Sequence, residues 1–445
     1  MGYADGMGGT MNEALNGFRQ AVQRGDTAEV ARLLTVPSIR AHVNDPMFDF
    51  GQRATHVAAK NPQLLTVLIE ASADLTLASD WDKGPFTVLD QADEPTARFL
   101  MSRGVPLTAN VAARLGWLDE LAALVDSAPS VVHARGGDGK QPLHEARTPA
   151  IADFLLDRGA GIDVRCIDHH STPAQYALVD RPDVCQRLLD RGALPDIFMA
   201  ARLGDLALAE RLIAEDDGCL TARVHAPGYA PVPPFAIYCW TLGFDVSPEQ
   251  VARRFGHHKV QDLFVARSPA RVRLMNAVTV GDEAAARAIL AGDASLLSSL
   301  TAAEHGRLAV AIFHERFDAA AVMLRLGFDP AAPGPDGGTA LHAACWVGHR
   351  PTVDLILARG VVPIDARDPT HGSTPLGWAA FGSVHRRAAH GDYPAVAERL
   401  VAAGADATAP GNRLGKTLLE MAEGNGRMQE TLARLADTAG RGGSL

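Results

Sequence analysis

The residues of this chain that could do chemistry together lie toward its C-terminal end. His371, His385 and Tyr393 could converge near Trp346, and histidine and tyrosine side chains can hold or donate a proton at a reacting atom. This constellation is the only one in the sequence that suggests an enzyme. A binding surface, or simply a set of exposed polar residues, is the favoured interpretation, because no HExxH, EF-hand, Walker A or GxSxG motif occurs.

Metal chemistry is not expected from the ligand-type residues. The chain has 16 histidines and five cysteines. Adjacent histidines such as His169 and His170 would point to different sides of a helix, and no CxxC spacing occurs. The scattered cysteines are typical of small buried hydrophobic residues in a reducing compartment. The sequence therefore predicts no metal ion and no cofactor.

A repeated pattern must position these side chains. Residues 337–345 read GGTALHAAC, and a second copy of the pattern begins at Thr374 and Pro375. Threonine is a preferred N-cap and proline fits the first turn of a helix, so a helix is expected to begin there. Pairs such as Gly281 and Asp282 predict the end of one helix and the cap of the next. Each copy is therefore expected to contain two helices.

This self-similarity, at a period of about 33 residues around a T-P-L-H-x-A core, resembles the ankyrin-repeat family in a degenerate, bacterial-type form. The resemblance covers roughly residues 15–439. It implies an all-α fold, a solenoid of about 12–13 helix-turn-helix units with two insertions. Inner helices and the turns between units, called fingertips, would line a concave groove. The resemblance also implies that His56, His144 and His342 hydrogen-bond to a neighbouring turn.

The pattern divides the chain into five parts. Residues 15–224 are expected to form an N-terminal ankyrin array with its cap, and residues 247–439 a C-terminal array with a second cap. An insertion rich in proline and aromatic residues, 225–246, separates the two arrays. The glycine-rich ends, residues 1–14 and 440–445, are expected to be disordered.

The insertion at residues 225–246 leaves two interpretations open. It contains Tyr238 and Trp240, and prolines near its start exclude a regular helix there. In the first interpretation it links two half-arrays, and its aromatic side chains fill the joint between them. In the second it forms a lid or wall over a pocket, because long loops of this composition are often functional.

A second insertion, residues 381–390, adds eight residues to the repeat that begins at Thr374. It contains His385, Arg386 and Arg387, which predict a cationic, pH-sensitive spot on the groove side of the array. One interpretation is a solvated extension of the helix. The other is recognition of a carboxylate or phosphate, whose geometry suits arginine.

Alignment to the repeat predicts which residues face the groove. The two residues after the small-residue pair normally do so, and these are Trp346 and Val347 in one repeat and Phe381 and Gly382 in the next. An exposed tryptophan and phenylalanine one repeat apart suit a pair of binding hot spots. The candidate binding residues are Trp346, Val347, His371, Trp378, Phe381, His385, Arg386 and Arg387, with Tyr238 and Trp240 of the first insertion, and the fingertips add Asp336, Gly338 and Ser373.

Charge and hydropathy limit the classes of partner. The net charge is −10 and the isoelectric point about 5.9. Nucleic acids and anionic membranes reward clustered basic residues, so neither is expected as the main partner. No apolar run reaches the roughly 18 residues that a membrane span needs, and the N-terminus lacks the features of a secretory signal. A cytoplasmic monomer is expected.

The leading hypothesis from the sequence is a scaffold that binds a partner protein through the groove of the later repeats. Trp346 and Phe381 would be the apolar anchors, and Arg386 and Arg387 the charged contact. The alternative is a small-molecule-binding protein or an unrecognised enzyme, with a pocket formed by the groove and the insertion at 225–246.

Overall fold

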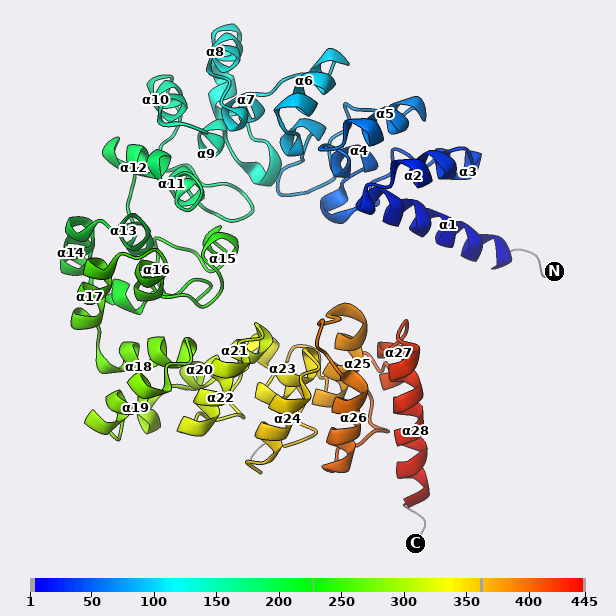
Figure 1. Cartoon of the computed structure of the whole chain (residues 1–445), viewed down its shortest axis with the longest axis vertical. Helices are drawn as coiled ribbons and strands as arrows, with labels where there is room; N and C mark the ends of the chain where they lie inside the picture. The colour runs from blue at the N-terminus through cyan, green and yellow to red at the C-terminus, as the bar shows by residue number, and fades with distance from the viewer. Residues whose placement is uncertain (1–4, 227, 361–362, 443–445) are drawn as a thin grey trace. The chain divides into compact units, whose positions relative to one another are not determined.

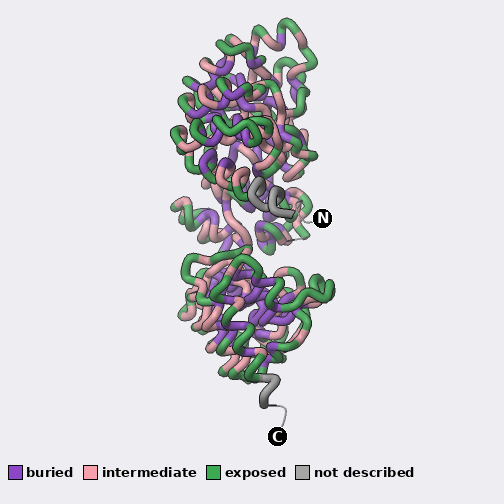
Figure 2. Tube along the Cα trace, turned by 90° about the vertical axis from the view of Figure 1, so that its right-hand side faces the viewer, coloured by how far each residue is buried: buried purple, intermediate pink, exposed green. Residues whose placement is uncertain are grey.

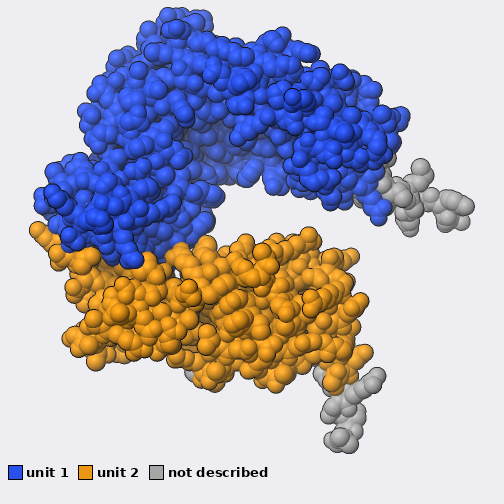
Figure 3. Space-filling model, viewed as in Figure 1, with its two compact units in different colours: residues 1–263 blue, residues 264–445 orange. Residues whose placement is uncertain are grey.

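The computed structural model describes residues 5–226, 228–360 and 363–442. Within these ranges every regular element is an α-helix or a short 3-10 helix, and the only β feature is an isolated antiparallel bridge between Phe48 and Gln52. The predicted all-α class is thereby confirmed. The chain divides into two compact units, Met1–Leu263 and Phe264–Leu445, which are called the N-terminal unit and the C-terminal unit (Figure 3).

The N-terminal unit is built from short helices joined by turns and loops (Figure 1). The helix α17 (His258–Arg267) crosses the division between the units. The other α-helices of this unit are α1 (Asp5–Arg24), α2 (Thr27–Leu34), α3 (Pro37–Arg40), α4 (Ala54–Val57), α5 (Pro62–Glu70), α6 (Glu94–Ser102), α7 (Ala109–Leu115), α8 (Leu118–Ser127), α9 (Pro142–Glu145), α10 (Pro149–Asp157), α11 (Pro173–Ala177), α12 (Pro182–Asp190), α13 (Ile197–Leu203), α14 (Leu206–Glu215), α15 (Tyr238–Thr241) and α16 (Pro248–Arg254). The 3-10 helices are η1 (Asp49–Gly51), η2 (Val88–Gln91), η3 (Pro129–His133), η4 (Gly137–Gly139) and η5 (Asp217–Thr221).

The C-terminal unit carries the more regular helix pairs. Its α-helices are α18 (Ala270–Thr279), α19 (Glu283–Gly292), α20 (Ala302–His305), α21 (Arg307–Phe313), α22 (Phe317–Leu326), α23 (Ala340–Trp346), α24 (Arg350–Leu357), α25 (Pro375–His385), α26 (Tyr393–Ala402), α27 (Leu418–Met421) and α28 (Gly426–Gly442). Two 3-10 helices, η6 (Leu297–Ser299) and η7 (Pro335–Gly337), lie between them.

The helices begin and end where the cap residues predicted. The Thr374 side chain accepts a hydrogen bond from the backbone N–H of Gly377 at 3.2 Å and so caps α25. Gly281 has a φ of +76°, a left-handed conformation that glycine adopts without strain. Asp282 then accepts from the N–H of Ala285 at 2.9 Å and starts α19. The same chemistry thus separates and restarts consecutive helices.

Helices of the same kind stack on one another in the C-terminal unit (Figure 1). The first helices of successive pairs, α21, α23, α25 and α27, contact one another in that order, and so do the second helices α22, α24, α26 and α28. The buried side chains between the two rows form one continuous hydrophobic core from Leu274 to Leu435. Figure 2 shows buried segments inside this unit and exposed ones around them. The stacked helix pairs therefore fix the positions of the side chains at the ends of the first helices.

Three histidines link consecutive repeats, as the resemblance implied. The Nε2 atoms of His56, His144 and His342 donate to the backbone carbonyls of Phe86, Ser171 and Ser373 at 3.0, 3.2 and 3.2 Å. In each case Nδ1 accepts from the backbone N–H three residues earlier. Burial lowers the pKa of all three histidines, that of His144 to about 4. They are therefore structural links and neutral when folded.

The termini and the division of the chain differ from the sequence-based expectation. Disorder was expected through residue 14, but α1 begins at Asp5. Helix α28 extends to Gly442, into the tail expected to be disordered from residue 440. Residues 1–4 and 443–445 lie outside the described residues. The units divide between Leu263 and Phe264, so the insertion at 225–246 lies within the N-terminal unit and not at the joint.

Candidate functional site

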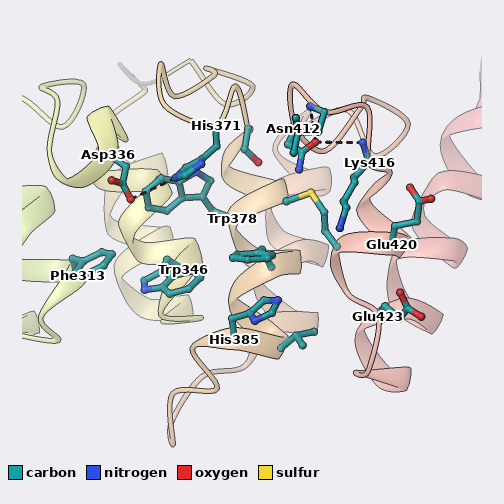
Figure 4. A pocket seen from close by; sticks show the side chains of 15 residues that line it. Phe313, Asp336, Trp346, His371, Trp378, His385, Asn412, Lys416, Glu420 and Glu423 are labelled. Atoms are coloured by element: carbon teal, nitrogen blue, oxygen red, sulfur yellow. Dashed lines mark hydrogen bonds and ion pairs between the residues drawn. The ribbon is translucent and has the colours of Figure 1, made fainter. Parts of the chain in front are cut away.

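A pocket of about 560 Å³ opens on the C-terminal unit (Figure 4). Its walls come from the ends of the first helices α21, α23 and α25, from the fingertip loops, and from α27. The lining is mostly apolar at the centre and polar at the edge. The lining residues are Phe313, Asp336, Trp346, His371, Ser373, Trp378, Phe381, Val384, His385, Asn412, Leu414, Lys416, Glu420, Met421 and Glu423.

Aromatic rings from three successive helix pairs form the apolar wall. The rings of Phe313 and Trp346 lie nearly parallel with their centroids 6.2 Å apart, and those of Trp346 and Phe381 are 6.1 Å apart. Phe381 is 42% exposed. A Cβ at Gly382 would lie 2.5 Å from the carbonyl oxygen of Trp346, so glycine is what lets α25 approach the end of α23 this closely. Gly382 is buried at that contact, contrary to its predicted exposure.

A buried carboxylate fixes the fingertip side of the pocket. Asp368 accepts hydrogen bonds from the backbone N–H groups of His371 and Ser373 and, at 2.9 Å, from Nε1 of Trp378. Burial alone would raise the pKa of Asp368, but these hydrogen bonds outweigh burial and lower it. The His371 ring lies 3.6 Å from the Asp336 carboxylate of the preceding fingertip. The loop that carries His371 is therefore held in place at the pocket.

The edge of the pocket carries more negative than positive charge. Asp336, Glu420 and Glu423 contribute carboxylates, and Lys416 contributes an ammonium group. Glu420 accepts from the backbone N–H and the hydroxyl of Thr417 at 2.7 and 2.9 Å, and these bonds lower its pKa. Figure 4 places Asp336 at one end of the pocket and Glu420 and Glu423 at the other. The site is thus an apolar cleft with carboxylates at both ends.

Five of the predicted binding residues lie together in this pocket: Trp346, His371, Trp378, Phe381 and His385. The ring of His385 lies 3.9 Å from that of Phe381. Asp336 and Ser373, predicted at the fingertips, line the pocket as well.

Two further candidates, Val347 and Tyr393, do not line the pocket. Val347 is fully buried, because α23 ends at Trp346 and the next residue turns into the core, so its predicted exposure is wrong. The Tyr393 hydroxyl donates to the carbonyl of Trp346 at 3.1 Å and accepts from the N–H of Ala388. Burial raises the pKa of Tyr393. Tyr393 does not converge with His371 and His385 in the pocket. Its hydroxyl instead links the backbone of Trp346 to that of Ala388.

The second insertion is a helical extension followed by an ion-paired loop. Helix α25 continues to His385, so the interpretation as an extended helix fits the first half of the insertion. Arg386 and His390 both contact the carboxylate of Glu315, His390 at 3.1 Å. Arg387 is exposed and does not line the pocket. Arg386, one of the two arginines expected to bind an external anion, is therefore already paired with a carboxylate of this chain.

The first insertion packs onto the N-terminal unit. Tyr238 is fully buried, and its hydroxyl donates to Asp196 at 3.0 Å. The Tyr229 hydroxyl accepts from the N–H of Ile197 at 3.1 Å. Tyr238 was predicted as a binding residue, but its side chain is buried inside the N-terminal unit and offers no surface to a partner. Trp240 is 59% exposed and lies 4.5 Å from the ring of His169. None of the described residues of the first insertion, 225–226 and 228–246, lines the pocket of the C-terminal unit.

Sequence reasoning missed several lining residues. Phe313 belongs to a repeat without a TPLH element, although it stands one repeat before Trp346 at the equivalent position. The repeat after α26 was interpreted only as a polar cap. Yet it supplies Asn412, Leu414, Lys416, Glu420, Met421 and Glu423. The run of end-of-helix aromatic residues at one-repeat spacing was the signal that could have revealed Phe313.

Helix pairs stack on one another beside this pocket, and comparison with known proteins identifies one of the pairs as a known repeat. Residues 336–369 match the ankyrin repeat family. This segment contains α23, α24 and the fingertip residue Asp336. The chain thus contains an ankyrin repeat at these residues. It is also 33% identical over 112 residues to Protein PhlB of Serratia liquefaciens, a match that covers 25% of this chain and 44% of that protein.

None of the helices that the structure describes is long and apolar enough to cross a membrane. The described residues hold no group of three or more His, Cys, Asp or Glu side chains that could bind a metal ion.

Proposed function

We propose that this protein is an ankyrin solenoid scaffold, and that it binds a partner protein through the pocket of its C-terminal unit. Ankyrin repeats are protein-binding elements in general, and the matched repeat at residues 336–369 contributes Trp346 and Asp336 to the pocket. The pocket would be the part of a concave groove where the partner's main anchor docks.

The observation that carries the proposal is the aromatic wall. Phe313, Trp346 and Phe381 come from three successive helix pairs and gather in one pocket. Aromatic side chains bury much area at small entropic cost and dominate the energetics of protein interfaces. Phe381 is 42% exposed and lies beside the partly exposed ring of Trp346, and apolar side chains grouped at one exposed place favour an interaction site.

A small-molecule ligand is the second candidate. A volume of about 560 Å³ lies within the range of ligand-binding pockets, and His371 and His385 could orient such a ligand. The expected difference is in scale, because a protein partner would cover exposed residues around the pocket, such as Leu414, whereas a small molecule would touch only the wall.

The proposal is tested by affinity capture from a lysate of the source organism. The wild-type protein is compared with Trp346→Ala/Phe381→Ala, and Phe235→Ala/Trp240→Ala serves as the matched control. The control removes two exposed aromatic side chains from the N-terminal unit (61% and 59% exposed). Circular dichroism and thermal melting check that both variants stay folded.

A protein retained by the wild type and the control but lost from the pocket variant supports the proposal. Retention by all three proteins contradicts it. A small molecule that co-purifies in the same pattern, without any protein, favours the second candidate. Loss from the control variant alone would instead place the site on the insertion at 225–246.

A further inference from the structure

We infer that the pocket of the C-terminal unit takes a cationic side chain, arginine or lysine, presented by the partner between apolar neighbours. The inference rests on the proposed function and adds the chemistry of the anchor. Three observations support it: the aromatic wall, the charge at the two ends of the pocket, and the carboxylates of this chain that already engage the indole N–H of Trp378 and the guanidinium of Arg386.

The aromatic wall suits a cation. The faces of tryptophan and phenylalanine rings carry partial negative charge and attract a guanidinium or ammonium group. Arginine in addition stacks its planar guanidinium on such rings while its aliphatic stem covers apolar surface. Trp346 and Phe381 offer partly exposed rings side by side, and Met421 adds an apolar neighbour in the same pocket.

The charges at the ends of the pocket favour the same occupant. Three carboxylates line it, those of Asp336, Glu420 and Glu423, against the single ammonium group of Lys416. They stand at opposite ends of the row of rings (Figure 4). Glu420 is held ionised by its hydrogen bonds from Thr417. A positively charged side chain that lies across the aromatic rings would therefore meet a carboxylate whichever end of the pocket it points toward.

Two donors at or near the pocket are already engaged by carboxylates of this chain. The indole N–H of Trp378 already donates to Asp368, and Arg386 already contacts Glu315. Lys416, and His371 or His385 if protonated, are the remaining cationic groups of the lining. His371 lies 3.6 Å from Asp336, so its charge would be offset there. The excess of carboxylates over cationic groups in the lining therefore supports a cation as the occupant, in place of the carboxylate or phosphate that one interpretation of the second insertion suggested.

The test uses the full chain and three capped tripeptides that carry arginine, citrulline or glutamate between two leucines. Citrulline matches arginine in shape but has no charge. Dissociation constants are measured by NMR titration at low ionic strength, where charge effects are largest. The arginine peptide is expected to bind about fivefold more tightly than the citrulline peptide, and the glutamate peptide more weakly than either.

Variants locate the charge effect. Glu420→Gln/Glu423→Gln should lower the affinity of the arginine peptide toward that of the citrulline peptide, because only Asp336 and the aromatic rings then favour the charge. Glutamine at 420 can still complete the capping box with Thr417. Lys416→Gln should tighten arginine binding. Glu430→Gln/Asp437→Asn, two exposed acids of α28 outside the pocket lining, makes the same change in net charge and should leave the preference for arginine intact.

The outcomes separate this inference from the proposed function. Equal binding of the arginine and citrulline peptides, with binding lost in Trp346→Ala/Phe381→Ala, overturns the cationic anchor and leaves the apolar docking site standing. Tighter binding of the glutamate peptide overturns the inference in favour of an anion. Failure of all three peptides to bind also overturns it, and the capture experiment then decides on the scaffold independently.

Discussion

The indole N–H of Trp378 donates to a carboxylate oxygen of Asp368 at 2.9 Å, and this bond ties the helix α25 to the fingertip loop before it. Asp368 is 2% exposed and also accepts from two backbone N–H groups of that loop. One buried side chain thus fixes both the tryptophan of the pocket and the loop that carries His371. The pocket owes its shape to this link as much as to the stacked helices.

Replacing Asp368 should damage the pocket and the stability of the chain together. Asp368→Ala leaves the indole N–H and two backbone N–H groups without their acceptor, and hydrogen bonds to a charged group contribute about 1.5–3 kcal/mol each at most. We expect a loss of about 2–4 kcal/mol in the free energy of unfolding, measured by urea denaturation. Asp365→Ala, in the same loop but less buried, is a control for a general effect of removing an acid. A loss equal in both variants would contradict the role assigned to Asp368.

His144 should titrate far below the ordinary pKa of histidine. Burial lowers its pKa from 6.5 to about 4, so the unfolded chain takes up a proton at a higher pH than the folded chain does. The stability that neutral His144 contributes is therefore complete above about pH 6.5 and is lost as the pH falls toward about 4. NMR titration of histidine-labelled protein measures this directly. An imidazole signal of His144 that titrates near 6.5 would show that the ring is not held neutral between the repeats.

The first insertion should behave as a packed part of the N-terminal unit. Tyr238→Phe removes the hydroxyl that donates to buried Asp196, and a lost partner of a buried group costs about 1–3 kcal/mol. Trp240→Phe, two residues further along α15 and 59% exposed, should change the melting temperature little. Thermal melts of both variants check this. Equal, small effects would mean that the insertion is loosely attached and free to act as a lid.

Where its repeats are regular, the sequence predicted several of the residues that line the pocket. Trp346 and Phe381 both follow a small-residue pair in well-formed copies, and the histidine links were implied by the same pattern. Val347 was misplaced because it follows the last residue of α23, where its side chain is buried in the core and does not face the groove. Tyr238 was misplaced because an aromatic residue in a proline-rich loop can cover a buried acid as readily as it can face solvent.

The arrangement of charged groups around the pocket could not be predicted from the sequence. Arg386 pairs with Glu315, which is 71 residues away along the chain, and no local pattern announces such a contact. Glu420 and Glu423 belong to a final repeat whose polar residues were assigned to a cap, yet stacking brings them beside the rings of earlier repeats. The balance of charge at the pocket thus emerges only once non-neighbouring repeats are placed side by side.

The most direct test of the central claim is the affinity of the captured partner for three purified proteins, measured by titration calorimetry. If the pocket of the C-terminal unit is the docking site, Trp346→Ala/Phe381→Ala should weaken binding by about a hundredfold or more, since two hot-spot side chains are removed. Phe235→Ala/Trp240→Ala should bind within about threefold of the wild type, because surface changes away from a site have small effects. Binding of the pocket variant at wild-type affinity, with its fold intact, would contradict the account.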